Sequence, residues 1–308
     1  MSRRQVLACG LGTAYLRRQL RRGSWVAVYE GVYVTHTGPM TWTQRAWCAV
    51  LDAAPAALSH NSALCAVTGD SGEANGPVHI SVDARRSVTR RRGVVAHYRT
   101  DFDEAVVRDA HPPRVRTDEA VLDVAAGAPT ITKAVAALSD AVQARITTPG
   151  RLLDALDGRC RIRRRQLLRE VLLDVDTGVC SVLEHRYLAK VERPHGLPAP
   201  LRQTPTAVGR RGFRDVEYEE FGLIVELDGR LGHADAVSRD RDLQRDLDAA
   251  VHGDRLTLRL GWGQVFDRPC STASSVAQAL TRRGWAQAPR PCRRVDCPIG
   301  HVEADSAA

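Results

Sequence analysis

The sequence predicts a multidomain α/β protein, and three observations support that class. The chain has 308 residues and 44% apolar content, enough for two or three domains with separate cores. Segments with helical periodicity alternate with short runs that favour strands. A long helical stretch between residues 130 and 174 separates two regions that both mix helices and strands. We therefore expect N-terminal modules, a helical linker and a C-terminal α/β domain.

Residues 1–37 begin with two short predicted helices, at 3–9 and 13–22, followed by strands at 24–29 and 32–34 around a Glu30-Gly31 turn. Helix, turn, basic helix and hairpin in this order are typical of a winged helix-turn-helix. The second helix of that fold enters the DNA major groove, and the hairpin touches the backbone. A winged helix that only packs or contacts protein is the alternative. The predicted DNA contacts are Arg17, Arg18, Arg21 and Arg22.

The segments Gly23-Ser24-Trp25-Val26 and Gly31-Val32-Tyr33 resemble the winged-helix domain of AbiEi-type antitoxins. Residues 38–128 resemble the region after the winged helix in members of that family. They contain an apolar helix pair over 42–66 whose second helix starts at Ser59, strands at 77–83 and 93–98, and a helix over 117–127. The resemblance implies a small α/β domain with a structural or partner-binding role, a toxin being one such partner. We interpret His60 as a capping or packing residue.

Residues 129–178 predict a helical linker broken at Gly150 and Gly158. The net charge is +8, and Lys133 and Lys190 are the only lysines among 44 basic residues. Genome composition alone can produce such an arginine bias. A basic chain with arginine clusters nevertheless suits a polyanion, because neutralising phosphates drives sequence-independent binding. These clusters are Arg85-Arg86, Arg90-Arg91-Arg92 and Arg163-Arg164-Arg165.

The most informative segment is 215–228, which predicts a hairpin turning at Glu220-Phe221. In that register the numbers of any two paired residues add up to 441, so Asp215 lies opposite Glu226. Asp228, two residues after Glu226, lies on the same face of the strand. Like charges across a hairpin repel, and the apolar run 223–225 argues for burial, which raises the cost. A divalent cation would offset the repulsion, and Mg²⁺ prefers oxygen ligands. The alternative is an exposed acidic strand face.

Beyond the hairpin, a Gly-containing turn leads to His233, which suits a general acid or base. A helix is predicted over 238–252, with Ser238 as its N-cap and Gly253 as its stop. Arg239 on that helix is a predicted DNA contact; a solvated helix with local charge pairs is the alternative. A strand over 255–260 comes next.

This order of parts resembles the PD-(D/E)XK nuclease superfamily, and most closely its branch similar to very-short-patch-repair endonucleases. Glu184, in the predicted helix 181–188, matches the family's first acidic residue, and Asp215, Glu226 and His233 match its metal-binding and histidine positions. The resemblance implies a restriction-endonuclease-like α/β domain over 179–290 with a mixed central sheet. It also implies a Mg²⁺- or Mn²⁺-dependent hydrolysis of DNA phosphodiester bonds in which Glu184 and Asp228 complete the metal shell.

Two departures favour a different function. The superfamily's lysine two residues after the second acidic residue is Asp228 here, and Gly232 replaces the aromatic that commonly precedes the histidine. The alternative is a non-catalytic DNA-binding regulator or antitoxin-like protein that retains an inactive nuclease fold. A purely partner-binding protein is a third hypothesis.

No segment approaches 18 consecutive apolar residues, so we expect no membrane span and a cytoplasmic protein with reduced thiols among its eight cysteines. Residues 291–308 predict a disordered tail. Within that tail Cys292, Cys297 and His301 could join Cys270 in a zinc site, but their spacing fits no common zinc module. The expected metal is therefore Mg²⁺ or Mn²⁺ rather than zinc.

Overall fold

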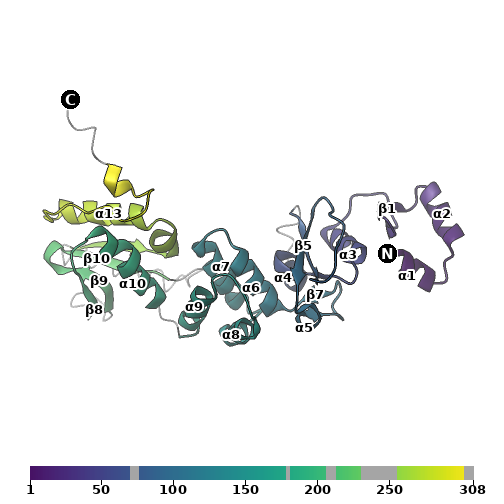
Figure 1. Ribbon diagram of the computed structural model, residues 1–308, viewed down its shortest axis with the longest axis horizontal. Coiled ribbons are helices and arrows are strands. Elements are labelled where there is room, and N and C mark those ends of the chain that lie inside the picture. The colour runs from purple at the N-terminus through teal and green to yellow at the C-terminus, as the bar shows by residue number, and fades with distance from the viewer. Residues whose placement is uncertain (70–75, 178–180, 206–212, 230–254, 302–308) are drawn as a thin grey trace, which may run out of the picture. The chain divides into compact units, whose positions relative to one another are not determined.

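The computed structural model describes residues 1–69, 76–177, 181–205, 213–229 and 255–301 (Figure 1). Two compact units make up the chain: Met1–Gly127 with Ala144–Ile162, and Ala128–Gln143 with Arg163–Ala308. Within the described residues the fold is mixed α/β with three sheets, one of which is a mixed sheet in the second unit. No helix in these ranges is both long and apolar enough to cross a bilayer.

The first unit begins with two helices and a hairpin, in the order that the sequence predicts. The elements are α1 (Arg3–Ala8), α2 (Thr13–Arg21), β1 (Val26–Tyr29) and β2 (Val32–Val34). Ser2 and Gln5 form a capping box at α1, which satisfies two backbone N–H groups at the start of the helix. Val6, Leu16 and Tyr33 form a small core between the helices and the hairpin.

The rest of the first unit is built around a sheet in the order β5-β4-β3-β7-β6. Its strands are β3 (Ala57–Leu58), β4 (Val78–Asp83), β5 (Val94–Arg99), β6 (Val106–Val107) and β7 (Arg114–Val115). Its helices are α3 (Trp42–Asp52), α4 (His60–Thr68), α5 (Phe102–Ala105), α6 (Thr117–Gly127) and α8 (Pro149–Gly158).

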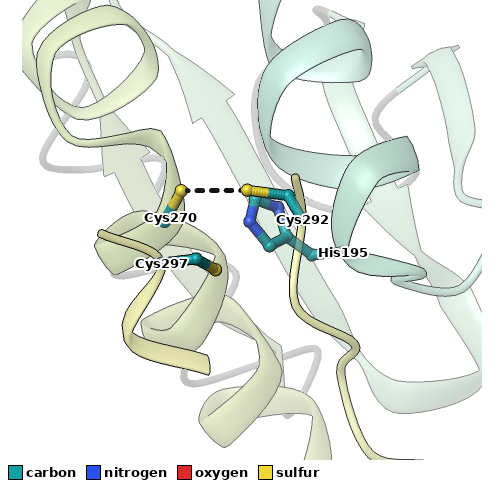
Figure 2. A group of neighbouring side chains, drawn as sticks. All are labelled: His195, Cys270, Cys292 and Cys297. Atoms are coloured by element: carbon teal, nitrogen blue, oxygen red, sulfur yellow. Dashed lines mark hydrogen bonds between the residues drawn. The ribbon is translucent and has the colours of Figure 1, made fainter. Parts of the chain in front are cut away.

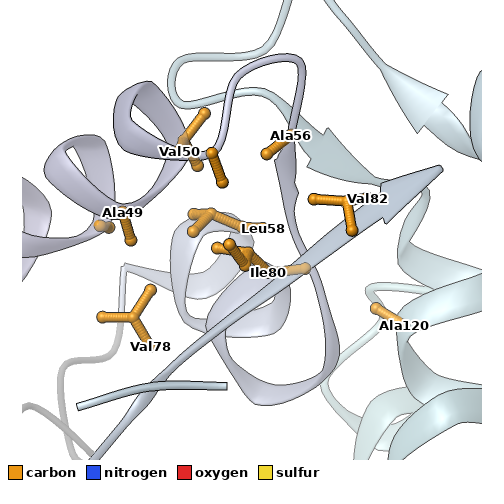
Figure 3. Packing of buried hydrophobic residues seen from close by; sticks show 11 residues of the cluster. Ala49, Val50, Ala56, Leu58, Val78, Ile80, Val82 and Ala120 are labelled. Carbon is orange, nitrogen blue, oxygen red and sulfur yellow. The ribbon is translucent and has the colours of Figure 1, made fainter. Parts of the chain in front are cut away.

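The predicted helix pair over 42–66 is interrupted by β3, which pairs antiparallel with β4 and parallel with β7. Helix α3 ends at Asp52 because Pro55 comes soon after and cannot continue it. Leu58 and Ile80, which face each other across β3 and β4, lie in the middle of the core (Figure 3). A strand of two residues carries no periodicity, so sequence patterns do not detect it.

Buried ion pairs hold α8 in the first unit. Arg159, just after α8, donates to Glu119 Oε2 through Nε at 2.8 Å and to Asp123 Oδ1 at 2.7 Å. Arg99 on β5 donates to the same two carboxylates, each at 2.8 Å. Four charges from β5, α6 and the end of α8 therefore neutralise one another where little water reaches them.

The predicted helix break at Gly150 is wrong. Gly150 lies inside the first turn of α8, and the preceding break falls just before Thr148, whose side chain accepts from the backbone N–H of Arg151. Pro149 is the first helical residue, where its missing N–H costs nothing. The other predicted break is confirmed, because α8 ends at Gly158.

The second unit combines a four-stranded sheet, in the order β11-β10-β9-β8, with several helices. Its strands are β8 (Leu201–Pro205), β9 (Phe213–Tyr218), β10 (Leu223–Leu227) and β11 (Leu256–Leu260). Its α-helices are α7 (Ile131–Gln143), α9 (Arg165–Thr177), α10 (Ser181–Tyr187), α11 (Arg193–His195) and α13 (Pro269–Arg282). Shorter turns of helix are η1 (Leu188–Glu192), η2 (Glu219–Phe221), η3 (Gly263–Asp267) and η4 (Pro298–His301).

Strand β10 is central, antiparallel to β9 and parallel to β11. Leu223, Ile224 and Val225 are all buried, as expected of a strand covered on both faces. Asp267 in η3 fixes the start of α7, because its carboxylate accepts from the backbone N–H of Ile131 at 3.1 Å and from the Thr132 hydroxyl at 2.6 Å.

The sequence predicts disorder for 291–308, and the structure differs over 291–301. Cys297 is buried, η4 contacts α13, and the backbone N–H of Arg290 donates to the carbonyl of His195 at 3.0 Å. Residues 302–308 lie outside the described residues.

Candidate active site

The register of the β9–β10 hairpin is the one predicted from sequence. Val216 pairs with Val225, Glu217 with Ile224, and Tyr218 with Leu223. The turn is the short helix η2, and it closes at Gly222, whose φ of 56° is a conformation that favours glycine. Continuing this register by one residue sets Asp215 opposite Glu226.

The acidic end of the hairpin is held by backbone hydrogen bonds. Asp215 Oδ2 accepts from the backbone N–H of Leu227 at 2.7 Å. The backbone N–H of Asp228 donates to the carbonyl of Leu260 at 2.9 Å, and Trp262 Nε1 donates to the carbonyl of Gly229 at 2.8 Å. The ends of β10 and β11 therefore fix the backbone that carries the carboxylates.

Glu184 on α10 reaches this region from outside the sheet. Gln203 Nε2 donates to its Oε1 at 3.0 Å. Burial raises the pKa of Glu184, the hydrogen bond from Gln203 opposes that shift, and the negative charge of Asp215 raises it further. The negative charge of Asp215 therefore disfavours ionisation of Glu184. A bound cation would reverse that preference.

A cleft of about 610 Å³ opens beside Asp228 in the second unit. Basic side chains on its wall are Lys133, Arg259 and Arg268. Arg259 pairs with Glu226 in the β10–β11 register, so a basic residue stands beside an acidic one on the neighbouring strand. Such a lining suits a substrate that carries negative charge and meets a cation at the carboxylates.

Sequence reasoning missed the role of Glu217, a fourth carboxylate of the hairpin. It is buried, accepts from Arg214 Nη1 at 2.6 Å and also forms an ion pair with Arg255. Because two guanidinium groups satisfy it, Glu217 stabilises the sheet and needs no metal.

Other predicted site residues lie outside the described ranges or in the first unit. His233, Arg239 and the predicted helix over 238–252 lie outside the described residues. The four arginines at the end of α2 belong to the first unit, where they lie on or beside that helix. They are Arg17, Arg18, Arg21 and Arg22.

The structure also brings together two clusters that sequence spacing does not reveal. In the second unit, His195 lies with Cys270, Cys292 and Cys297, and each offers a ligand atom within 4.8 Å of the others (Figure 2). The histidine of this group is His195, and the side chain of the predicted His301 lies outside the described part of the chain. His195 is far from the cysteines in sequence, so no spacing motif contains it.

The second cluster joins His60, His79 and His97 in the first unit. His79 Nδ1 lies 2.9 Å from His97 Nε2, and the rings of His60 and His97 stack with centroids 3.7 Å apart. Burial, with the neighbouring His97 and His79, lowers the pKa of His60 to about 3. His60 therefore stays neutral at physiological pH and packs as an aromatic ring, with Ser59 Oγ 3.2 Å from its Nδ1.

In comparisons with known proteins, no protein-family model and no curated protein matches this chain. Its function is therefore inferred from the chemistry of its own residues.

Proposed function

We propose that this chain is a DNA-binding protein whose second unit is a metal-dependent endonuclease of the PD-(D/E)XK type. The observation that carries the proposal is the β9–β10 register, which pairs Val216 with Val225 and, continued by one residue, would set Asp215 opposite Glu226. Glu184 is close enough for its pKa to respond to Asp215. Carboxylates on facing strands suit a divalent cation, and oxygen ligands select Mg²⁺ or Mn²⁺.

Asp215 and Glu226 would hold the metal, and Glu184 and Asp228 would complete or position its shell. A divalent ion at this place supplies charge neutralisation for a phosphodiester and a more acidic bound water. The basic cleft beside Asp228 would orient the DNA backbone, and His233 would act on the water or the leaving group.

The first unit would bring the chain to DNA. Helix α2 is rich in arginine and precedes the β1–β2 hairpin, which is the arrangement in which a winged helix-turn-helix contacts DNA. Under this proposal Arg17, Arg18, Arg21 and Arg22 contact phosphates or bases, and each lost contact weakens binding and lowers its salt dependence.

A second function is favoured by Asp228, which stands where the superfamily has a lysine. Without that ammonium group, the domain would bind DNA and metal without turnover, as a regulator or antitoxin-like protein. A toxin is the kind of protein partner that this alternative implies.

The test compares the full chain with its Asp215→Ala variant on nicked, mismatched and single-stranded DNA, in Mg²⁺ or Mn²⁺. The matched control is Glu220→Gln, because Glu220 is an exposed carboxylate in the turn of the same hairpin. We expect metal-dependent cleavage that falls by about 100-fold or more in Asp215→Ala and is unchanged in Glu220→Gln.

DNA affinity, measured at low salt with a quadruple alanine variant of the α2 arginines, separates the two functions. Absence of cleavage by the wild type, together with binding that these arginines control, supports the regulator. Absence of both cleavage and DNA binding contradicts both functions and favours a protein partner.

A further inference from the structure

Three thiols and one imidazole converge in the second unit, in a group that shares no residue with the carboxylates of the hairpin (Figure 2). The Sγ atoms of Cys270 and Cys292 are 3.5 Å apart, and all four ligand atoms lie within 4.8 Å of one another. Cys270, Cys297 and His195 are buried, and Cys292 is half-buried. The group is therefore a compact, largely water-free set of sulfur and nitrogen atoms.

His195 supplies an independent reason to expect a ligand. Its side chain is fully buried, and its Nδ1 lies 2.8 Å from the carbonyl oxygen of Val191. Because a carbonyl only accepts, the proton resides on Nδ1, and Nε2 presents a lone pair. In the described part of the chain this Nε2 has no hydrogen-bond partner. A buried nitrogen left unpaired is costly, and a metal ion would satisfy it.

The backbone around the cluster holds its members in place. His195 ends α11, and Gly196 comes next with a φ of 64°. An added Cβ on Gly196 would approach Arg290 Nε to 2.8 Å, so the chain leading to Cys292 lies directly against this turn. Cys270 is the second residue of α13. Three separate segments therefore meet at the four ligand atoms.

We propose that His195, Cys270, Cys292 and Cys297 bind one structural Zn²⁺ ion. Thiolate sulfur and imidazole nitrogen are the ligands that zinc takes in structural sites, and four protein ligands leave no position for a substrate. With Zn–S bonds of about 2.3 Å, tetrahedral geometry sets sulfur atoms roughly 3.8 Å apart, close to the separation observed. The site would tie the segment that carries Cys292 and Cys297 to α11 and α13.

The thiols of the cluster influence one another's ionisation. Burial and the neighbouring Cys292 and Cys297 raise the pKa of Cys270 to about 12. Without a cation this group would remain a protonated thiol, and binding of a divalent ion would release its proton. A disulfide between Cys270 and Cys292 is the competing explanation, but it would leave Cys297 and the buried Nε2 of His195 without a role.

The experiment measures zinc in the full-length protein, purified under reducing conditions from zinc-supplemented medium. We expect about one ion per chain, lost in Cys292→Ser and in Cys297→Ser. The matched control is Cys160→Ser, which changes an exposed cysteine of the first unit and should retain the ion. Cys292 and Cys297 lie in the C-terminal segment, outside the α-helices and strands of the second unit. Circular dichroism therefore verifies that these helices and strands still form in both variants.

Replacement of zinc by Co²⁺ distinguishes this site from the histidine cluster. Thiolate ligands produce charge-transfer absorption in the near ultraviolet, which His97→Gln should leave intact and Cys292→Ser should weaken. Removal of the ion with a chelator should also expose 285–301 to proteolysis. The proposal would be overturned if Cys292→Ser and Cys297→Ser both retained the zinc ion. It would also be overturned if mass spectrometry found a Cys270–Cys292 disulfide in protein purified under reducing conditions.

Discussion

Glu119→Gln tests whether buried ion pairs hold α8 in the first unit. The carboxylate of Glu119 is 5% exposed and accepts from Arg99 and Arg159, whose side chains are 9% and 10% exposed. The substitution keeps the shape of the side chain and removes its charge. Two guanidinium groups then share Asp123 as their well-buried counterion, with Asp101 a more exposed partner of Arg99.

Removal of one partner from a buried ion pair costs about 3 to 5 kcal/mol, because an uncompensated charge stays out of water. The Arg108–Asp103 pair provides the control, since its side chains are 60% and 65% exposed and Asp103→Asn should cost less than about 1 kcal/mol. The difference between the two variants therefore measures burial rather than the presence of an ion pair.

Hydrogen exchange of amides in α6 and α8 is a suitable assay, because a chain with two units need not unfold in one step. A loss of about 3 kcal/mol corresponds to roughly 100-fold faster exchange where opening limits protection. If the amides of α6 and α8 exchanged at the same rate in Glu119→Gln as in Asp103→Asn, apolar packing, and not the ion-pair network, would hold α8 in place.

Two further predictions concern the first unit. Leu58→Ala should lower the free energy of unfolding by about 2 to 5 kcal/mol, because Leu58 is fully buried; Val107→Ala, at an exposed position, should cost less than about 1 kcal/mol in the same urea titration. His60→Gln should flatten the acid dependence of stability. The pKa of His60 falls from 6.5 to about 3 on folding, so the unfolded chain takes up the proton first, and stability is lost as pH falls through that interval. Urea unfolding midpoints of the wild type and His60→Gln, measured at neutral pH and midway between the two pKa values, check this. An equal fall of the midpoint with pH in both proteins would refute it.

Local signals in the sequence predicted many elements within a residue or two. The α1 helix was expected over 3–9 and runs over Arg3–Ala8, because Ser2 and Gln5 form a cap within one turn. The β9–β10 register followed from an apolar run and a turn of fixed length, so the pairing of Val216 with Val225 was also within reach. The capping of α1 and the register of the hairpin both depend on residues that are close together in the sequence.

The sequence by itself therefore indicated several helices, such as α1 and α6, and the register of the β9–β10 hairpin, since propensity, capping and alternation act over short distances. Tertiary structure alone decided which helices join which unit, that Glu217 is neutralised by Arg255, and that β3 completes a sheet. It also decided that His195 meets the three cysteines. Such contacts join residues tens of positions apart, and only the burial of a shared core sets them side by side.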